Sequence, residues 1–372
     1  MRARHHTSRK IRYAVVGLGH IAQNAILPAF QHAENNSELA AIISDDPAKL
    51  RAMSKEYGVE NCFSYKDYEL CLHSGEIDAV YIALPNNMHA DYCVRAAEAG
   101  IHVLCEKPLA VTEDECHQII GACADNNVKL MTAYRLHFER GNLEAINIVR
   151  SGKIGEPKIF NSVFTMQVAP GNIRTKPHYS GTPLYDIGIY CINAARYMFG
   201  KEPVEVLGLG ATTSDSRFRH SEEMSSAIMR FPDERLASFT VSFGASDTAD
   251  FEVIGTKGRL RVIQAYEYSM PVVLELTREG RTQRQTYAQR DQFAPELIYF
   301  SDCILHDREP EPSGLEGLID VHIIRSLYHS MKSGLPVMLK QLQRQKRPSL
   351  RQEIYRPRVK NPNLVHVAAP TK

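Results

Sequence analysis

The sequence lacks the paired cysteines that mark structural metal sites and disulfide frameworks. Its eight cysteines form no Cys-x-x-Cys pair, and none has a histidine partner at zinc-finger spacing. Common structural zinc sites depend on such spacings. We therefore expect no metal site, no disulfide framework, and mostly buried, reduced thiols. The cysteines occupy positions 62, 71, 93, 105, 116, 123, 191 and 303.

Long apolar runs are also missing. No stretch of the chain approaches the roughly 20 apolar residues that a membrane-spanning helix needs. The basic segment 1–10 leads directly into the apolar run 11–16, without the apolar core and cleavage site of an export signal. We therefore expect a cytoplasmic protein with no membrane partner.

Positive and negative charges nearly balance, at a formal net charge of +1, but they are unevenly placed along the chain. Residues 340–372 hold nine Lys or Arg and a single acid, Glu353, and residues 1–10 form a basic N-terminal arm. The body between them is acidic, whereas a nucleic-acid surface needs a broad basic face. We therefore expect no nucleic-acid partner. The basic tail 341–372 is expected to be solvated or to wrap a subunit, with polyanion binding as the alternative.

The first part of the chain alternates apolar runs of strand length with helical segments. This alternation is typical of a doubly wound parallel sheet, and it predicts a Rossmann dinucleotide-binding domain over residues 11–134. Pro28 lies inside the first helix and is expected to kink it or end it early. Strands are expected at residues 11–16, 39–43, 79–84, 102–105 and 129–131, with helices reaching about residue 30, covering 47–57 and 89–99, and running through residue 120.

After residue 150 the pattern changes to longer β-type runs separated by turn signals, which predict an open, mainly antiparallel sheet. A chain of 372 residues with 44% apolar content can bury two cores. We therefore expect a second, α+β domain over residues 135–340, and an α/β fold class overall. Its strands are expected at 158–165, 225–231, 237–243, 251–254 and 260–263, and its helices from near Asp186 to before Gly200, at about 295–306 and at 314–333.

A glycine-rich turn follows the first expected strand. Residues Gly17-Leu18-Gly19-His20-Ile21-Ala22 match the G-x-G-x-x-A pattern and open the first helix. The first glycine permits a tight turn, the second lets the backbone approach a pyrophosphate at the helix N-terminus, and the alanine lets helix and strand pack closely. This placement between a strand and a helix predicts a dinucleotide site.

The end of the second strand distinguishes the two nicotinamide cofactors. An acid there binds the ribose hydroxyls of NAD, whereas a small polar residue with a nearby cation suits the extra phosphate of NADP. Ser44 occupies this position and Lys49 follows it, while Asp45 or Asp46 would favour NAD if either turned inward. Successive side chains of an extended segment face opposite ways, so an inward Ser44 implies an outward Asp45. The sequence therefore favours NADP(H) over NAD(H).

Three polar segments are expected to meet above the cofactor. Leu84-Pro85-Asn86 with His89, and Glu106-Lys107-Pro108, each follow an apolar strand, and the carboxyl ends of such strands are where α/β sheets bind ligands. Asp186 and Tyr190 are four residues apart, so they share one face of a helix. Lys107, Asp186 and Tyr190 are therefore predicted to converge on one substrate hydroxyl.

Tyr190 is the candidate base. A phenol has an unperturbed pKa of about 10, so a nearby cation is needed to favour the phenolate at neutral pH. Lys107 and a cationic nicotinamide would supply that field. Asp186, near the helix start, suits the helix dipole and could accept a hydrogen bond from a substrate hydroxyl. The alternative for Tyr190 is a core aromatic beside Tyr197 and Phe199.

These motifs together resemble one family, the glucose-fructose oxidoreductase, inositol dehydrogenase and MocA (Gfo/Idh/MocA) superfamily. The resemblance runs from about Ile11 to Pro336. It rests on Gly17-Leu18-Gly19, Leu84-Pro85-Asn86 with His89, Glu106-Lys107-Pro108 and Asp186-Ile187-Gly188-Ile189-Tyr190. A tyrosine at position 190, where many relatives have histidine, and the segments Tyr134-Arg135 and Cys191–Tyr197 are similar to the glucose-fructose oxidoreductase branch.

The resemblance implies an enzyme of carbohydrate metabolism with tightly bound NADP(H). Such an enzyme oxidises a cyclic aldose at C1 to an aldonolactone and reduces a second sugar carbonyl. Lys107 and Tyr190 would assist proton transfer, and Asp186 would orient the sugar. The implied cofactor contacts are Gly17, Leu18, Gly19, His20, Ile21, Ser44, Lys49, Leu84, Pro85, Asn86, His89, Glu106, Lys107, Arg135, Ile173 and Arg174. Of these, Ser44 and Lys49 would contact the 2′-phosphate. The implied sugar contacts are Lys107, Tyr134, Arg174, Asp186 and Tyr190.

The sequence departs from the family pattern in the substrate loop. The usual Trp-Arg dipeptide reads Ile173-Arg174, and the usual glycine-rich run reads Ser180-Gly181-Thr182-Pro183. The arm that buries the cofactor in the glucose-fructose enzyme is reduced to residues 1–10.

Two alternative functions stay open: an NADP-dependent sugar or trans-dihydrodiol dehydrogenase that exchanges its cofactor, and a non-catalytic sugar or nucleotide sensor. The resemblance also implies a homodimer or homotetramer that packs through the second sheet.

Overall fold

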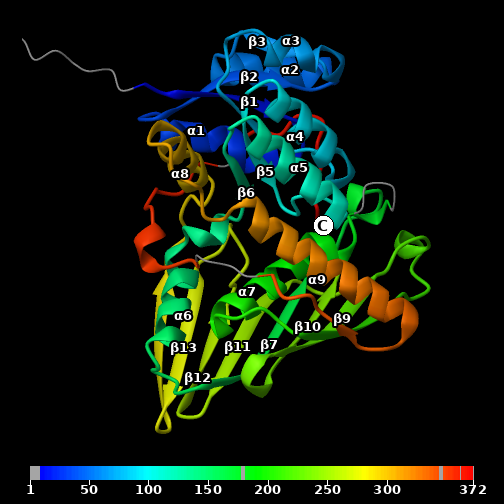
Figure 1. Cartoon of the computed structure of the whole chain (residues 1–372), viewed down its shortest axis with the longest axis vertical. Coiled ribbons are helices and arrows are strands. Elements are labelled where there is room, and N and C mark those ends of the chain that lie inside the picture. The colour runs from blue at the N-terminus through cyan, green and yellow to red at the C-terminus, as the bar shows by residue number, and fades with distance from the viewer. Residues whose placement is uncertain (1–8, 177–180, 343–346, 361, 372) are drawn as a thin grey trace, which may run out of the picture.

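The computed structural model of the chain describes residues 9–176, 181–342, 347–360 and 362–371. Residues 1–8 of the expected arm, Ser180 of the substrate loop, and Arg344, Lys346 and Lys372 of the basic tail lie outside the described residues. Two sheets organise the molecule, a smaller one in the upper half of Figure 1 and a larger one in the lower half.

The smaller sheet has six parallel strands in the order β3-β2-β1-β4-β5-β6. Helices lie between most successive strands, and the Rossmann-like parallel sheet that the alternation predicted is confirmed. The elements are β1 (Ile11–Val16), α1 (Leu27–Ala33), β2 (Ser37–Ile43), α2 (Pro47–Tyr57), β3 (Asn61–Phe63), α3 (Tyr68–Leu72), β4 (Ala79–Ile82), α4 (His89–Glu98), β5 (His102–Glu106), α5 (Glu113–Asp125) and β6 (Leu130–Ala133).

The first helix does not end early at Pro28. A π-helical turn, Ala22–Ile26, precedes α1, and the helix continues to Ala33. Proline cannot donate the backbone hydrogen bond that an α-helix interior requires. The wider turn directly before it changes the local hydrogen-bond pattern, so the chain stays helical through the proline.

The larger sheet has nine strands in the order β14-β13-β12-β11-β7-β10-β9-β8-β15. Neighbouring strands are antiparallel except β7 and β10, which pair in parallel, so the expected mainly antiparallel sheet is confirmed. The strands are β7 (Pro157–Thr165), β8 (Glu205–Ala211), β9 (Met224–Phe231), β10 (Arg235–Ser242), β11 (Thr248–Gly255), β12 (Gly258–Ile263), β13 (Val272–Arg278), β14 (Arg281–Tyr287) and β15 (Val337–Met338).

Helices cover one face of the larger sheet and leave the other face open (Figure 1). The covering helices are α6 (Arg140–Arg150), α7 (Ile189–Phe199) and α9 (Gly314–Ser333), whereas α8 (Ala294–Leu305) returns to pack on α1, β1 and β2. Because α9 also contacts α5 and β6, it joins the two halves of the molecule. The open face exposes between 41% and 68% of Ile159, Val163, Leu209, Ile228 and Leu236.

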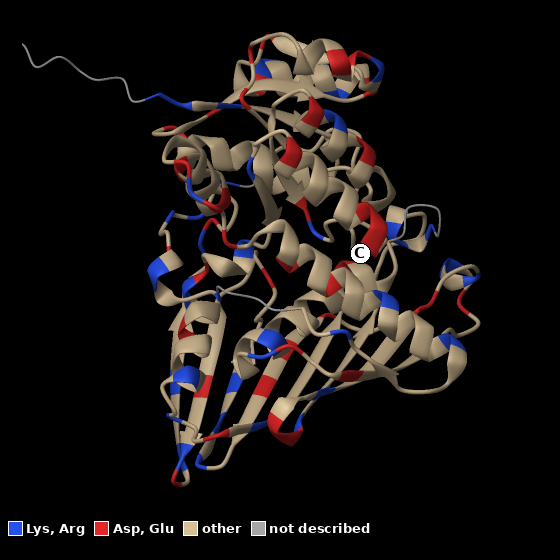
Figure 2. Ribbon diagram, in the orientation of Figure 1, with Lys and Arg blue, Asp and Glu red and all other residues tan. Residues whose placement is uncertain are grey.

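All eight cysteines are free thiols, and all but Cys62 are buried. Within the part of the chain that the structure describes, no helix is long and apolar enough to cross a membrane. The same residues contain no group of three or more His, Cys, Asp or Glu side chains placed to hold a metal ion. Lys and Arg are interspersed with Asp and Glu over both halves of the molecule (Figure 2).

Candidate active site

A cavity of about 800 Å³ lies between the two sheets, at the carboxyl ends of the parallel strands. Seventeen of the residues singled out from the sequence line it, although they come from segments as far apart as residues 17 and 190. They are Gly17, Leu18, Gly19, His20, Ile21, Ser44, Lys49, Leu84, Pro85, Asn86, Glu106, Lys107, Arg135, Ile173, Arg174, Asp186 and Tyr190.

The glycine-rich turn depends on its glycines. Gly17 has φ +98°, and a Cβ atom there would lie 2.6 Å from the Ala83 carbonyl oxygen, so only glycine fits. A Cβ on Gly19 would meet nothing within 4 Å, which leaves the backbone open for close approach by a ligand. The buried Gln23 amide donates to the Leu18 carbonyl oxygen at 2.9 Å and fixes the turn from behind. This cradle fits a pyrophosphate at a helix start.

Ser44, directly after β2, and Lys49, in the first turn of α2, line the cavity, whereas the carboxylates of Asp45 and Asp46 do not. Asp45 accepts a hydrogen bond from the Tyr65 backbone N–H at 2.8 Å. Asp46 caps α2 by accepting from the Ala48 and Lys49 backbone N–H groups. Because both carboxylates are engaged outside the cavity, the site offers a hydroxyl and an ammonium group, which suit a phosphate better than ribose hydroxyls alone.

Lys107 and Asp186 form the centre of the site. The Lys107 Nζ donates to the Asp186 carboxylate Oδ1 at 2.9 Å and to its backbone oxygen at 2.7 Å. The second carboxylate oxygen accepts from Arg174. Burial opposes ionisation of Asp186, but Arg174 and Lys107 outweigh it and lower the pKa of that carboxyl far below its usual range. Asp186 is therefore an anion at every pH near neutrality.

The Lys107 ammonium keeps its charge although it is buried. Burial alone would lower its pKa, but Asp186 and Tyr190 raise the pKa above that of a free lysine. Its side chain is only 12% exposed, so little water screens the charge. The structure thus places a persistent positive charge in a low-dielectric site.

Tyr190 lies between two cations. Lys107 Nζ is 4.9 Å and Arg135 Cζ 5.0 Å from the centroid of its ring. Phe164 and Tyr266 pack against the ring, with centroid distances of 5.7 and 5.9 Å. The ring is therefore held between packed aromatic side chains, with two cations close to it.

Two of the expected contacts do not reach the cavity wall. The hydroxyl of Tyr134 donates to the buried carboxylate of Asp320 in the interior behind the site. Both ring nitrogens of His89 lie against backbone oxygens, those of Pro108 at 2.8 Å and Leu84 at 2.9 Å. His89 therefore ties the loops after β4 and β5 together, and Tyr134 fixes the start of the segment that carries Arg135.

A buried ionic cluster behind the site holds α7 against α9. Arg196 is fully buried and donates to Glu316 at 2.8 Å and to Asp320 at 2.6 Å, and it also pairs with Glu202. Burial, together with the neighbouring Glu316, raises the pKa of Asp320 to about 7, against the pull of Arg196. Such a cluster is costly to bury unless its geometry is well satisfied. It fixes the helix that carries Tyr190.

Sequence reasoning singled out Glu106 but missed the buried carboxyl group near it on the cavity wall, that of Glu296. Glu106 accepts a hydrogen bond from Tyr81 at 3.0 Å, and Glu296 accepts from the same hydroxyl at 3.4 Å. Burial raises the pKa of both carboxyls, that of Glu296 strongly. Glu296 stands at the start of α8, more than 180 residues after Glu106, and no spacing rule links the two.

Two segments from the C-terminal part of the chain also line the cavity, although no sequence motif predicted this. The loop after β12 contributes a run of polar and aromatic side chains, and the tail contributes three small residues near its end. These additional lining residues are Tyr266, Glu267, Tyr268, Ser269, Ala369, Pro370 and Thr371.

Comparisons with known proteins agree with this arrangement. Residues 11–134 match the family model described as an oxidoreductase family with an NAD-binding Rossmann fold, and residues 142–261 match that of the GFO/IDH/MocA C-terminal domain. A D-xylose 1-dehydrogenase [NADP(+)] from Haloarcula marismortui is 31% identical over 340 residues, which cover 90% of this chain and 94% of the relative.

Solved structures are similar over nearly the same span. The aldose-aldose oxidoreductase from Caulobacter crescentus, complexed with glycerol, has a TM-score of 0.84 and 34% identity, covering 89% of this chain and all of that one. A 3-ketoreductase from Actinomadura kijaniata, in complex with NADP and TDP-benzene, has a TM-score of 0.80 and 25% identity, covering 87% of this chain and 98% of its own.

Proposed function

Since the chain belongs to the Gfo/Idh/MocA family of oxidoreductases, we propose that it is an NADP(H)-dependent enzyme that oxidises and reduces sugars. The observation that carries the proposal is the meeting of Lys107, Asp186 and Tyr190 in the cavity that the glycine-rich turn also lines. The NADP-dependent xylose dehydrogenase and the aldose-aldose oxidoreductase support the choice of cofactor and of substrate class.

The cavity has groups for both ends of the cofactor. The glycine-rich turn would hold the pyrophosphate, and Ser44 with Lys49 would bind the 2′-phosphate. Arg135 and Glu106 lie in the same cavity as Lys107, so they would face the nicotinamide half. When bound, the nicotinamide supplies the hydride chemistry that amino-acid side chains lack.

The proposed role of Tyr190 is to take the proton of the sugar hydroxyl that is being oxidised. Lys107 and Arg135 lie beside its ring, so both cations are placed to act on the phenol oxygen as the proton moves. Asp186, which stays ionised, would accept a hydrogen bond from a sugar hydroxyl and so orient the sugar ring in the site. Loss of the proton of the C1 hydroxyl to Tyr190, and of the hydride of C1 that a bound nicotinamide would accept, converts a cyclic aldose to an aldonolactone.

The same three residues can serve the reverse direction. The protonated Tyr190 would donate its proton to the carbonyl oxygen of a second sugar as that carbon is reduced. A cofactor that remains bound between the two half-reactions would make the enzyme a sugar–sugar oxidoreductase. An exchanging cofactor would make it a simple NADP-dependent sugar dehydrogenase.

The test is the near-ultraviolet absorbance of extensively desalted protein with no nucleotide added. We expect the reduced-nicotinamide band to rise when an aldose such as glucose or xylose is supplied, and to fall when a second sugar follows. A signal that appears only with added NADP⁺ would contradict the tightly bound cofactor and leave the exchanging dehydrogenase. No reduction of NADP⁺ by any aldose tested would contradict the enzyme itself.

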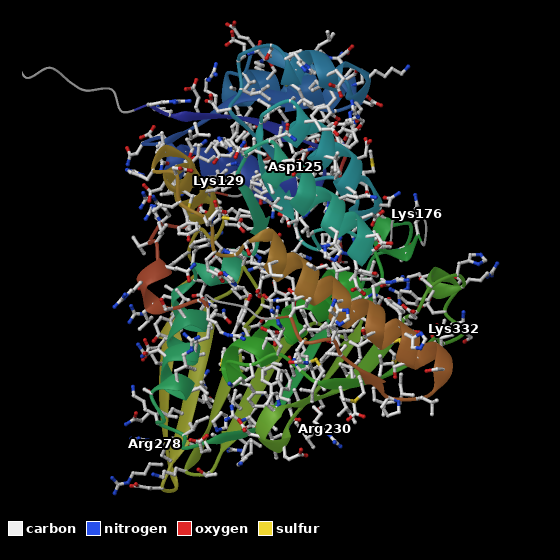
Figure 3. The ribbon with its side chains drawn as sticks, viewed as in Figure 1. Asp125, Lys129, Lys176, Arg230, Arg278 and Lys332 are labelled. Atoms are coloured by element: carbon white, nitrogen blue, oxygen red, sulfur yellow. The ribbon has the colours of Figure 1, made fainter. Side chains whose placement is uncertain are left out.

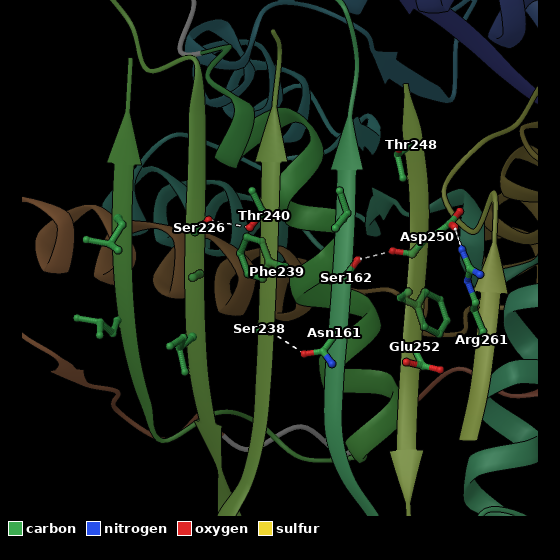
Figure 4. A pocket seen from close by; sticks show the side chains of 16 residues that line it. Asn161, Ser162, Ser226, Ser238, Phe239, Thr240, Thr248, Asp250, Glu252 and Arg261 are labelled. Carbon is green, nitrogen blue, oxygen red and sulfur yellow. Dashed lines mark hydrogen bonds and ion pairs between the residues drawn. The ribbon is translucent and has the colours of Figure 1, made fainter. Parts of the chain in front are cut away.

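We also propose that the open face of the larger sheet packs against a second copy of the chain. Figure 4 shows this face from close by. A shallow cavity of about 540 Å³ on it is lined by side chains of several strands, including Val163, Leu209 and Ile228. Exposed apolar patches of this kind mark interaction surfaces.

We expect the native chain to sediment as a dimer in sedimentation velocity, and we expect the double substitution Leu209→Lys with Ile228→Lys to dissociate that dimer. Leu70→Lys, at an equally exposed apolar site on the Rossmann half, should leave it intact. A monomeric native chain would exclude this packing.

A further inference from the structure

We propose that residues Val365–Thr371, here called the C-terminal strap, form a third part of the cofactor site and slow release of the dinucleotide. The inference rests on the proposed NADP(H) site, but it concerns a segment beyond residues 11–134 and 142–261, which the family models match. Three residues of the strap, Ala369, Pro370 and Thr371, line the same cavity as the glycine-rich turn.

One end of the strap is bound to the Rossmann half. The Val365 backbone N–H donates to the Gln23 side-chain oxygen at 2.8 Å, and the Gln23 amide donates back to the Val365 oxygen at 3.0 Å. Gln23 is completely buried and also holds Leu18 in the glycine-rich turn. The first residue of the strap is therefore tied to the side chain that shapes the pyrophosphate cradle.

The next residue lies at the expected 2′-phosphate end. His366 Nδ1 is 2.9 Å from the Asp46 Oδ2, and Asp46 caps the helix that presents Lys49. Asp46 does not line the cavity, so this contact ties the strap to the start of the helix that carries Lys49. The strap thus contacts the dinucleotide site at two places along its length.

The other end of the strap is bound to the second half of the molecule. The Ala169 backbone N–H donates to the Pro370 oxygen at 2.9 Å, and Val168 and Thr371 form an antiparallel bridge. Val168 follows β7, is fully buried, and is itself held by the Phe243 oxygen at 2.9 Å. Figure 1 shows the C-terminal end between the upper and lower halves of the molecule.

The chain that leads to the strap is fixed as well. Glu353 pairs with Arg140 at 2.6 Å and with Arg290 at 2.8 Å, and the Arg356 side chain donates to the His32 backbone oxygen at 2.8 Å. A segment that is fixed upstream and bound to both halves forms a wall of the cavity. A dinucleotide whose groups lie against this wall would leave faster if the strap were displaced.

The strap can be locked with a reversible cross-link. In the antiparallel bridge between Val168 and Thr371, the hydrogen bond joins the neighbouring residues Ala169 and Pro370. Val168 and Thr371 are therefore a non-hydrogen-bonded pair. The Cα atoms of such pairs lie about 4.5 Å apart. This spacing suits a disulfide. We would make Val168→Cys with Thr371→Cys in a chain that also carries Cys62→Ser, because Cys62 is the exposed native thiol. A thiol count confirms closure.

The readout is the release of NADPH, followed by its fluorescence after mixing with excess NADP⁺. We expect release from the oxidised protein to be at least tenfold slower than from the same protein after reduction with dithiothreitol. Removal of residues 364–372 should speed release at least tenfold relative to the full chain. Equal release rates in the oxidised, reduced and shortened proteins would overturn the strap while leaving the NADP(H) site intact. Failure of the native chain to bind NADPH would instead overturn the proposed function on which the strap depends.

Discussion

Replacing Lys107 with methionine is expected to lower kcat for sugar oxidation by a factor of roughly 10²–10⁴, the usual contribution of a positioned proton-transfer system. Methionine keeps much of the volume but removes the ammonium that contacts Asp186 and faces the ring of Tyr190. Arg135 would then be the cation that remains beside the Tyr190 ring. The measurement is steady-state kcat with a saturating aldose, together with the Kd for NADPH.

The matched control is Lys129→Met. Lys129, labelled in Figure 3, pairs with Asp307 and Glu309 on the Rossmann half and does not line the cavity. The Lys129→Met enzyme should retain the native kcat. We expect the Kd for NADPH to change by no more than about threefold in either variant, since Lys107 would act mainly in the chemical step. A Lys107→Met enzyme with native kcat would remove this residue from the mechanism.

Replacing Ser44 with aspartate is expected to reverse the choice of cofactor, changing the ratio of kcat/KM for NADP⁺ to that for NAD⁺ by roughly 10²–10³. Ser44 is buried at the end of β2, 4% exposed, on the cavity wall with Lys49. A carboxylate there would oppose a 2′-phosphate, and like charges in contact cost several kcal/mol. The same carboxylate would bind the ribose hydroxyls of NAD. The measurement is kcat/KM with each nucleotide at a fixed sugar concentration.

Asp45→Asn provides the comparison for this variant. Asp45 is the next residue in the chain, but it binds the Tyr65 backbone N–H and does not line the cavity. Its removal should leave the preference for NADP⁺ within about threefold of the native value, because the charge is directed elsewhere. Equal effects of the two substitutions would show that the phosphate does not lie between Ser44 and Lys49.

The Rossmann half could be predicted from the sequence because its signals are local. Most of its strands are short apolar runs, a helical segment follows most of them, and the glycine-rich turn marks one strand end. Strand β3 was not expected, because it has only three residues and begins with Asn61. The larger sheet was only partly predicted. β14 reads Arg-Thr-Gln-Arg-Gln-Thr-Tyr and exposes its first six residues, so no apolar alternation marks it as a strand. Helix α6 also lacked a motif, although Glu139 caps it by accepting from the Gly141 and Asn142 backbone N–H groups.

The candidate site likewise contains residues that local sequence motifs reveal and residues that they do not. Lys107, Asp186 and Tyr190 could be singled out because each belongs to a motif with a strand or helix beside it. Glu296 and the strap could not, because their place in the cavity depends on how α8 and the chain after it return to the first sheet. Tyr134 was expected to contact the sugar, but its adjacency to Arg135 in the sequence does not reveal that its hydroxyl points to Asp320.

The position of the strap in the chain sets an order of events during synthesis. Both sheets precede it, so the glycine-rich turn, Lys107 and Tyr190 are translated before the residues that bind Gln23 and Ala169. At a translation rate of about 5–20 residues per second, domains fold as they emerge. Nucleotide could therefore enter the cavity before the proposed strap covers it, and closure of the strap would follow the folding of both sheets.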